Sequence, residues 1–359
     1  MLSNMVKAYS AIVSNFHKPV SPLLTFSGLF ILRIFVSVGM FFDLLFFPSL
    51  HRKKIIKPII IVGNPRSGTT FLQRFLVNQK IGVGMQLWKM LYPSLTLQKL
   101  IKPFLPIMEK ISPARFHFHA AHQTNLTAIE TDDPALLFRY FDGFFVYGFF
   151  LAWAKDDLKS HFDPRVRDTS KRDFAWLEKV WKRNLVAENH EQIIGKLFSL
   201  GVRLPQFLSQ FPGAKILYTI RDPLETVPSG LSLVTGVLDG RFGFWKLPKE
   251  KRDLFIERLY QAFLELSIRF HDDYVEGKIA KEKVKIVRYD RMMADFDGLM
   301  QELLPFLEIE PSSELLSIIR KTSEKQREHK SEHKYSLAQF GLSEERISRD
   351  YEKIYITFF

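Results

Sequence analysis

The chain of 359 residues contains no cysteine, which excludes disulfide bonds, thiol catalysis and thiolate metal sites. It also lacks low-complexity tracts and internal repeats, and 46% of its residues are hydrophobic, which argues against extended disorder. A chain of this length can form one large α/β domain with an appendage, or two modest domains. We expect the first.

Acidic residues are also scarce relative to basic ones, with 39 Asp and Glu against 51 Lys and Arg, so the net charge is +12. This balance favours anionic partners such as nucleotides, acidic lipids or nucleic acid, but it does not choose among them. The 34 phenylalanines would also suit contacts with a lipid or an acceptor substrate.

A long apolar run, LLTFSGLFILRIFVSVGMFFDLLFF, lies between Pro22 and Pro48 and is long enough to span a bilayer. No small-residue cleavage site follows it, so we do not expect a removed signal peptide. Inserting Arg33 into a bilayer would cost about 2.5–3.5 kcal/mol. About eighteen apolar residues would each contribute about −0.3 to −0.6 kcal/mol, so insertion of the whole run stays favourable. The alternative is one or two helices packed on the domain or lying in the membrane interface, with Arg33 and Asp43 snorkelling or paired.

Basic residues flank this run unevenly. Lys7 and Lys18 precede it, and the residues that follow it are His51, Arg52, Lys53, Lys54 and Lys57. The positive-inside rule therefore puts the remainder of the chain in the cytosol, at the cytoplasmic face of a membrane. We expect residues 1–57 to form a hydrophobic, membrane-associated helical segment and residues 58–359 to form the α/β domain.

The stretch PIIIVGNPRSGTTFLQRFL nearly matches a phosphate-binding loop, but Thr69 occupies the place of the lysine of a nucleotide kinase or ATPase. The β-branched run at 59–62 is typical of a buried parallel strand, and the residues after the loop have helical spacing. Gly63 and Gly68 permit a tight turn whose amides can point at one anion at the helix N-terminus. Arg66 supplies a planar cation, which suits one tetrahedral oxyanion better than a Mg²⁺-triphosphate.

At Pro65, Arg66, Ser67, Gly68, Thr69 and Thr70 the sequence resembles the sulfotransferases that use 3′-phosphoadenosine 5′-phosphosulfate (PAPS). In the carbohydrate and tyrosylprotein type, the loop that binds the 5′-phosphosulfate reads P-R-S-G-T-T. The resemblance implies a P-loop NTPase-like sulfotransferase fold, with a central parallel sheet flanked by helices. The alternative is that these residues only make a tight corner between strand and helix.

A second motif, AKILYTIRDPLETVPSG, also leads from a buried strand into a helix. A buried strand at 215–220 ends at Arg221, and Ser229 comes eight residues later on the next helix. The family pattern R-D-P-x-x-x-x-x-S implies that Arg221 and Ser229 bind the 3′-phosphate. An arginine at the carboxyl end of a strand also faces the crevice where open α/β sheets bind ligands, although Arg221 and Asp222 could form only a surface ion pair.

Two later segments extend the resemblance to about Ile354. VKIVRYDRMMADF is similar to the family's late strand and its V-R-Y-E-D-L turn, with Asp290 in the place of Glu and Arg291 in the place of Asp. SEHKYSLAQFGLSEERISRDYEKI is similar to the C-terminal segment of bacterial sulfotransferases. In this last region Lys330 or Lys334 could reach the nucleotide, or the basic residues could form a solvated face.

Sulfuryl transfer needs an acceptor oxygen in line with the sulfur, a base, and a positively charged side chain beside the leaving phosphate, where negative charge develops. Arg66 is the first candidate for that charge. Lys196 is the second, because its segment resembles the family's K-x-P stretch, although Leu197 and Phe198 replace the expected small residue and proline. We expect no metal, since no acidic residue resembles a Walker B aspartate.

The candidate base lies in HFHAAHQTNLTAIETDDPALLFRYF. The family places an acidic cluster in a comparable segment, so we favour Glu130, with Asp132 and Asp133 behind it. The alternative is that the aspartates cap a helix that opens at Pro134. The nearby histidines lack a third ligand at a suitable spacing and make a weak metal argument; they are His117, His119 and His122. The aromatic run at 138–153 suits a core helix better than an acceptor pocket.

The sequence therefore predicts a sulfotransferase that moves a sulfuryl group from PAPS to a hydroxyl, or an amine, of an acceptor such as a glycan or lipid. Its predicted partners are this nucleotide, the acceptor and a membrane, and not nucleic acid. One alternative is a divergent P-loop kinase, against which the missing lysine argues. The other is an inactive, membrane-associated nucleotide-binding protein, which the departures at Leu197, Phe198 and Arg291 leave open.

Overall fold

The computed structural model describes residues 1–111, 125–328 and 336–359. His117, His119, His122, Lys330 and Lys334 lie outside the described residues. By their internal contacts the residues form two compact units, each built from three segments of the chain. The first comprises 1–55, 83–191 and 231–263, and the second comprises 56–82, 192–230 and 264–359. The predicted division at residue 57 into a helical segment and one domain is not tested by these units and stays a prediction.

The second unit contains a parallel sheet, which confirms the predicted α/β fold with a central parallel sheet flanked by helices. Its strands stand in the order β2-β1-β3-β4 and are β1 (Ile59–Val62), β2 (Ile194–Lys196), β3 (Lys215–Ile220) and β4 (Val284–Arg288). In the register Ile61 lies beside both Lys196 and Leu217, and Ile220 lies beside Arg288. The chain leaves β1 toward β2 on one side and then passes to β3 on the other. Open parallel sheets bind ligands at the carboxyl ends of the strands beside such a switch point.

Apolar side chains on one face of the sheet pack against two helices, α4 (Thr69–Asn78) and α15 (Phe296–Phe306). Ile61 and Leu217 of the sheet belong to the same buried cluster as Leu72 of α4 and Met300 of α15. Burial of such a side chain contributes about 1.5–3 kcal/mol, so this cluster fixes the helix after β1 against the strands. The other helical elements of this unit are η5 (Phe198–Val202), α11 (Leu204–Gln210), η7 (Lys281–Lys283), α14 (Tyr289–Ala294), α16 (Ser313–Glu328), η8 (Ala338–Phe340), α17 (Glu344–Asp350) and α18 (Glu352–Phe358).

The first unit is helical in the residues that the structure describes. Its elements are α1 (Leu2–Phe16), α2 (Val20–Phe46), α3 (Ser49–Arg52), α5 (Leu87–Leu91), α6 (Leu95–Ile101), η1 (Lys102–Phe104), α7 (Leu105–Ile111), α8 (Asp133–Tyr140), α9 (Phe144–Val146), η3 (Tyr147–Leu151), η4 (Lys159–His161), α10 (Ser170–Glu188) and η6 (Phe244–Lys246). Two further helices, α12 (Pro223–Phe242) and α13 (Lys249–Val275), contain the boundaries between segments of the two units.

The predicted N-terminal hydrophobic segment forms α1 and α2. Helix α2 has Pro22 in its first turn and stops just before Pro48, at places where the missing N–H of proline costs least. Asp43 does not reach solvent: it is fully buried and its carboxylate accepts a hydrogen bond of 2.8 Å from Arg183 Nε of α10. Of the two possibilities expected for Asp43, the structure therefore has the paired one.

The aromatic run at 138–153 belongs to the core, as expected, but not as one helix. Helix α8 ends at Tyr140, the C-cap residue Phe141 adopts a left-handed conformation, and the chain continues through α9 into the π-helical turn η3. Phe141, Tyr147 and Trp153 are buried, and Trp153 stacks on Phe255 at 4.0 Å between ring centroids. The rings therefore fill the interior of the first unit.

Candidate active site

The loop at residues 63–68, here called the phosphate loop, connects β1 to α4. Its backbone has positive φ angles, which residues other than glycine rarely adopt. Gly63, Arg66 and Gly68 have φ values of 150°, 75° and 89°. A Cβ on Gly63 would lie 2.3 Å from the carbonyl oxygen of Thr219, so the loop approaches the end of β3 too closely for any side chain there. The consequence is a tight turn whose amides precede the N-terminus of α4, an arrangement suited to an anion.

Hydroxyl groups tie this loop to the neighbouring strand. Ser67 Oγ donates to the carbonyl of Asn64 at 2.7 Å and lies 2.7 Å from Thr219 Oγ1. Thr219 Oγ1 in turn lies 3.2 Å from the carbonyl oxygen of Val62. Asn64 Nδ2 donates to Ser267 Oγ of α13 at 2.7 Å, within the second unit. Sequence reasoning missed Thr219 and Asn64, although a hydroxyl near the end of the apolar strand KILYTI was an available signal.

The two predicted nucleotide motifs meet in the structure. Arg66 Nε donates to Ser229 Oγ of α12 at 3.1 Å, and Arg221 Nη1 donates to the carbonyl oxygen of Arg66 at 3.3 Å. The Arg221 guanidinium also forms an ion pair with Glu225 and lies 4.2 Å from the ring centroid of Tyr289. The contacts of Arg221 therefore go beyond a surface ion pair with Asp222. Tyr289 was missed, although it lies in the VRYD turn that carried part of the resemblance.

Lys196 lies at the carboxyl end of β2 and is almost completely buried, at 1% exposure. Its Nζ donates to Thr70 Oγ1 at 3.0 Å and lies 5.7 Å from the ring centroid of Phe198. Lys196 is therefore not an ordinary surface lysine. Because charged lysines are rarely buried without a polar partner, the contact with Thr70 ties the position of this ammonium to the phosphate loop. The second unit thus brings together Pro65 to Thr70, Lys196, Arg221 and Ser229 at the carboxyl ends of the strands.

The three candidate bases belong to the first unit and are all buried. Asp132 occupies the N-cap position of α8 without a capping hydrogen bond from its side chain, and its Oδ1 accepts from Trp181 Nε1 at 3.2 Å. Asp133 accepts from Thr131 Oγ1 at 2.7 Å. The backbone N–H of Glu130 donates to Met85 at 3.0 Å. Asp133 lies in the first turn of α8, where a carboxylate favours the helix dipole. The assignment of a base among these three stays a prediction.

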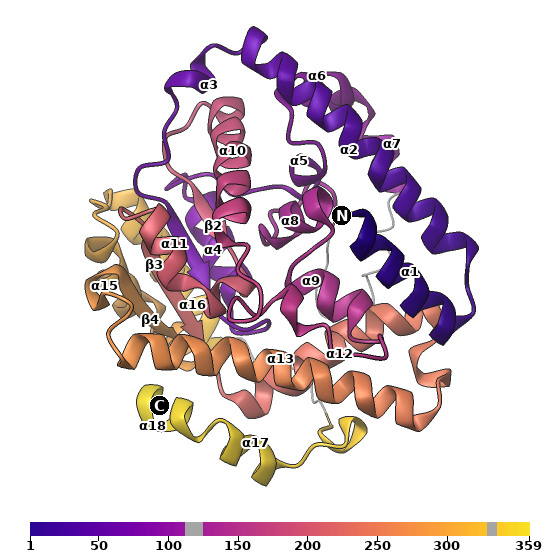
Figure 1. The fold of residues 1–359 in the computed structure, drawn as a ribbon. Helices are drawn as coiled ribbons and strands as arrows, with labels where there is room; N and C mark the ends of the chain where they lie inside the picture. The colour runs from indigo at the N-terminus through magenta and orange to yellow at the C-terminus, as the bar shows by residue number, and fades with distance from the viewer. Residues whose placement is uncertain (112–124, 329–335) are drawn as a thin grey trace. The chain divides into compact units, whose positions relative to one another are not determined.

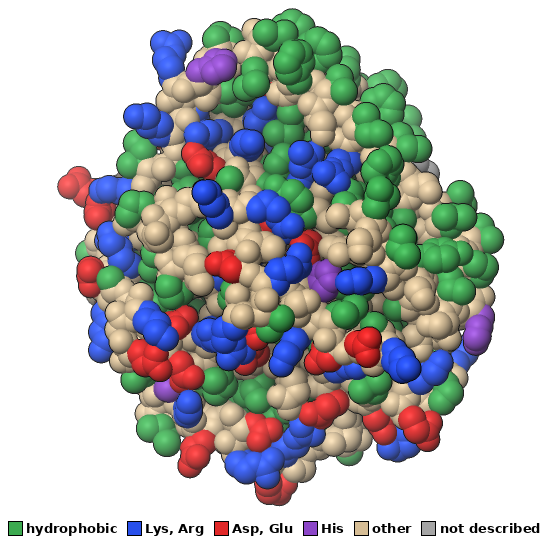
Figure 2. All heavy atoms as spheres, in the orientation of Figure 1, with side chains coloured by type: hydrophobic (Ala, Val, Ile, Leu, Met, Phe, Trp, Pro, Cys, Tyr) green, Lys and Arg blue, Asp and Glu red, His purple; other side chains and the backbone are tan. Residues whose placement is uncertain are grey.

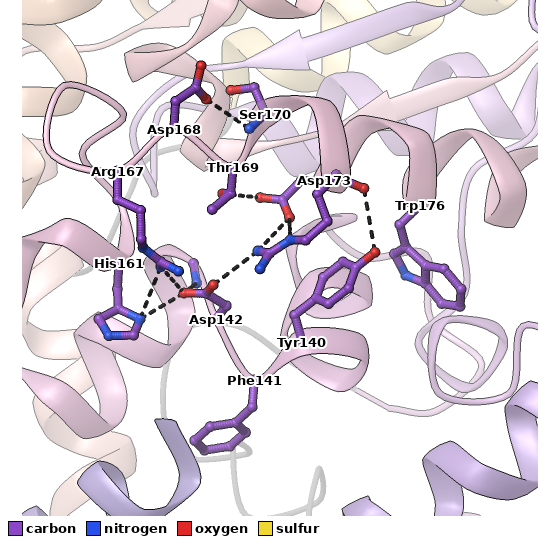
Figure 3. Close-up of polar contacts among 12 residues, drawn as sticks. Tyr140, Phe141, Asp142, His161, Arg167, Asp168, Thr169, Ser170, Asp173 and Trp176 are labelled. Carbon is purple, nitrogen blue, oxygen red and sulfur yellow. Dashed lines mark hydrogen bonds and ion pairs between the residues drawn. The ribbon is translucent and has the colours of Figure 1, made fainter. Parts of the chain in front are cut away.

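A polar cluster around Asp142 was not foreseen from the sequence (Figure 3). The buried Asp142 carboxylate lies 2.7 Å from His161 Nδ1 and accepts from Arg167 and Arg172 at 2.6 and 3.0 Å. Burial alone would raise the pKa of Asp142, but the hydrogen bonds from His161 and Arg167 outweigh it and hold the pKa well below its ordinary value. Asp142 is thus a stable anion that joins the end of α8 to η4 and to α10. The residues come together only through tertiary folding, so no local pattern could reveal them.

Among the described residues, no group of three or more His, Cys, Asp or Glu side chains could hold a metal ion. The expectation that the reaction needs no metal is not tested by this observation and stays a prediction.

Comparisons with known proteins show the family of this chain and its fold. Residues 58–313 match the model of the sulfotransferase family, so the chain belongs to that family. A comparison with curated proteins yields no match. The chain is similar in fold to the sulfotransferase STF1 from Mycobacterium tuberculosis H37Rv, with a TM-score of 0.70, 18% identity, and coverage of 98% of this chain and 90% of that one. It is also similar to the sulfotransferase STF9 from Mycobacterium avium, with a TM-score of 0.64, 15% identity, and coverage of 89% and 81%.

We predict that Gly63→Ala disrupts the loop. The new methyl group would meet the backbone of Thr219, which cannot move away without breaking the pairing of β3. We expect a loss of stability of about 1–3 kcal/mol in chemical denaturation. The matched control is Gly236→Ala on α12, where a Cβ meets nothing within 4 Å, and it should be neutral or slightly stabilising. Equal effects of the two substitutions would contradict the close approach.

Proposed function

We propose that this protein transfers a sulfuryl group from PAPS to a hydroxyl or amine of an acceptor. One observation carries the proposal: Arg66, Lys196 and Arg221 converge on a glycine turn at the carboxyl ends of parallel strands. Membership of the sulfotransferase family supports it. As predicted from the sequence, we place the reaction at the cytoplasmic face of a membrane, with an acceptor such as a glycan or lipid.

The residues of the second unit fit the nucleotide. The loop from Ser67 to Thr70 would hold the 5′-phosphosulfate, because its backbone leads into the N-terminus of α4, where the first amides have no partner within the helix. Arg221 and Ser229 would hold the 3′-phosphate, and the stacking of Arg221 on Tyr289 limits the directions in which its fork can point. PAPS supplies an activated sulfuryl group attached to a phosphate leaving group.

The roles of the chain's own groups follow from their charge. Arg66 and Lys196 stabilise negative charge that develops on the leaving phosphate, and Thr70 orients the Lys196 ammonium toward the loop. A carboxylate, with Glu130 first and Asp132 and Asp133 behind it, takes the proton of the acceptor hydroxyl. The acceptor oxygen is thereby made a better nucleophile at the moment of in-line attack.

Calorimetric titration distinguishes this function from its alternatives. We expect 3′-phosphoadenosine 5′-phosphate to bind more tightly than ATP with Mg²⁺, because Arg221 and Ser229 recognise a 3′-phosphate that ATP lacks. Arg221→Ala should weaken this binding about 10- to 100-fold, the effect of losing one charge-assisted contact. Glu225→Gln is the matched control, since it removes the ion-pair partner of Arg221 and retains the guanidinium.

Three results would contradict the proposal. Tighter binding of Mg²⁺-ATP would favour the divergent kinase. An unchanged affinity of Arg221→Ala for the 3′-phosphorylated nucleotide would show that the second motif only makes a turn between strand and helix. Binding of the 3′-phosphorylated nucleotide without any hydrolysis or transfer from PAPS would instead favour the inactive nucleotide-binding protein.

A further inference from the structure

Helix α2 exposes apolar side chains along almost its whole length. Leu24, Ile31, Val38 and Leu45 are 68%, 53%, 49% and 63% exposed. Successive members are seven residues apart, close to two helical turns, so they form one line along the helix. Further exposed side chains on either side of this line are Leu23, Phe30, Ile34, Phe35, Phe41, Phe42, Leu44 and Phe46. A continuous apolar surface of this extent marks a contact with a membrane or another protein.

The opposite face of α2 is fixed to the first unit. A Cβ on Gly39 would lie 2.7 Å from Ser94 Oγ and 2.8 Å from Leu97 Cγ, so α2 and α6 pack in close contact. Asp43 adds a buried network, accepting from Arg183, from Ser94 Oγ at 2.9 Å and from the backbone of Thr96 at 2.8 Å. Separating α2 from this unit to cross a bilayer would leave the Arg183 guanidinium buried without its counter-ion, which is strongly unfavourable.

The elements beside α2 continue the apolar surface. Leu100, Phe104 and Ile107, on α6, η1 and α7, are 63%, 58% and 62% exposed. Helix α6 packs against α2 and leads through η1 into α7 (Figure 1), and Figure 2 shows hydrophobic side chains gathered over this edge of the first unit. We call the exposed apolar residues of α2, α6, η1 and α7 the apolar edge.

The charges around the apolar edge indicate what covers it. Asp43 is the only acidic residue among the first 108 of the sequence, and it is buried. Exposed basic residues occur at both ends of α2 and along α6 and η1; they are Lys18, Arg52, Lys54, Lys99 and Lys102. Lys99 Nζ lies 4.8 Å from the ring centroid of Phe47, next to the end of α2. An apolar strip flanked by cations complements an anionic lipid surface, whereas a second copy would bring like charges together.

We propose that the apolar edge docks the protein on an anionic bilayer, with α2 lying in the plane of the membrane interface instead of crossing it. Among the described residues, α2 is the one helix with the length and composition of a membrane span. Its buried face and the Asp43–Arg183 pair favour the in-plane arrangement. This inference does not depend on sulfuryl transfer.

The absence of native cysteine allows a direct test of depth. Four variants of the full chain each carry one cysteine, at Leu24, Ile31, Val38 or Leu45, and each cysteine is labelled with an environment-sensitive fluorophore. The proteins are bound to vesicles of phosphatidylserine and phosphatidylcholine, and quenching by spin-labelled lipids measures the depth of each label. If α2 lies in the plane, the four labels report one shallow depth. If α2 spans, the 21 residues between the outer labels cover about 30 Å, and the labels at 31 and 38 lie deepest. The second result overturns the proposal.

A binding assay tests the surface itself. Ile31→Gln with Val38→Gln should lower cosedimentation with these vesicles about tenfold or more, and removing phosphatidylserine or raising the salt should weaken binding of the unmodified protein. The matched control is Val166→Gln with Ile356→Gln, which changes side chains at least as exposed but outside the apolar edge and should have no effect. The proposal is overturned if the unmodified protein does not bind vesicles, or if the control pair lowers binding as much as the first pair. It is also overturned if the protein self-associates and only Ile31→Gln with Val38→Gln abolishes this self-association.

Discussion

Arg66→Ala is expected to lower the rate of sulfuryl transfer about 10²- to 10³-fold, the usual effect of removing one preorganised donor from a charged transition state. The Arg66 guanidinium donates to Ser229 Oγ, and the backbone carbonyl of Arg66 accepts from Arg221. Alanine therefore retains the contact with Arg221 and loses the charge beside the loop. The measurement is transfer from PAPS to water, or to an acceptor identified in a hydroxyl screen, together with the affinity for the nucleotide.

Two further variants show whether the geometry of the Arg66 side chain matters. Arg66→Lys retains the charge without the planar fork and should fall between the wild type and Arg66→Ala. Arg349→Ala, which removes a side chain that is 73% exposed on α17, should leave the rate unchanged. A rate in Arg66→Ala within about threefold of the wild type would contradict a role in charge stabilisation.

Asp43→Ala is expected to lower the free energy of unfolding by about 3–5 kcal/mol, the cost of leaving a buried guanidinium without its partner. Asp43 is fully buried, the Arg183 side chain is 7% exposed, and the two charges are joined by a bond of 2.8 Å. The carboxylate also accepts from Ser94 and from the first turn of α6. Chemical denaturation of the full chain measures the effect.

The controls for Asp43 separate charge from packing. Asp253→Ala removes an exposed carboxylate paired with Lys249 and should change stability by less than about 1 kcal/mol. The double change Asp43→Leu with Arg183→Met removes both charges and should recover much of the loss, since apolar replacements of a buried pair are often tolerated. A loss in Asp43→Ala no larger than that in Asp253→Ala would show that the pair does not hold α2 in place.

The tight turn between β1 and α4 could be predicted because its determinants are local. A β-branched strand, two glycines at turn positions and a helical pattern lie within twenty residues, and short-range sterics decide their backbone. The same holds for the strand that ends at Arg221. The family pattern added the expected roles of Arg66, Arg221 and Ser229, and the structure brought these residues into contact.

By itself the sequence determined the strands and helices around the loop, the missing lysine and cysteines, and the apolar character of α2. Only the tertiary structure decided that Lys196 is buried beside Thr70, that Asp43 pairs with Arg183, 140 residues away, and that Asp142 gathers His161, Arg167 and Arg172. The physical reason is the range of the forces. Backbone sterics and hydrophobic periodicity act between near neighbours in the chain, whereas a buried charge finds its partner wherever folding excludes water around both.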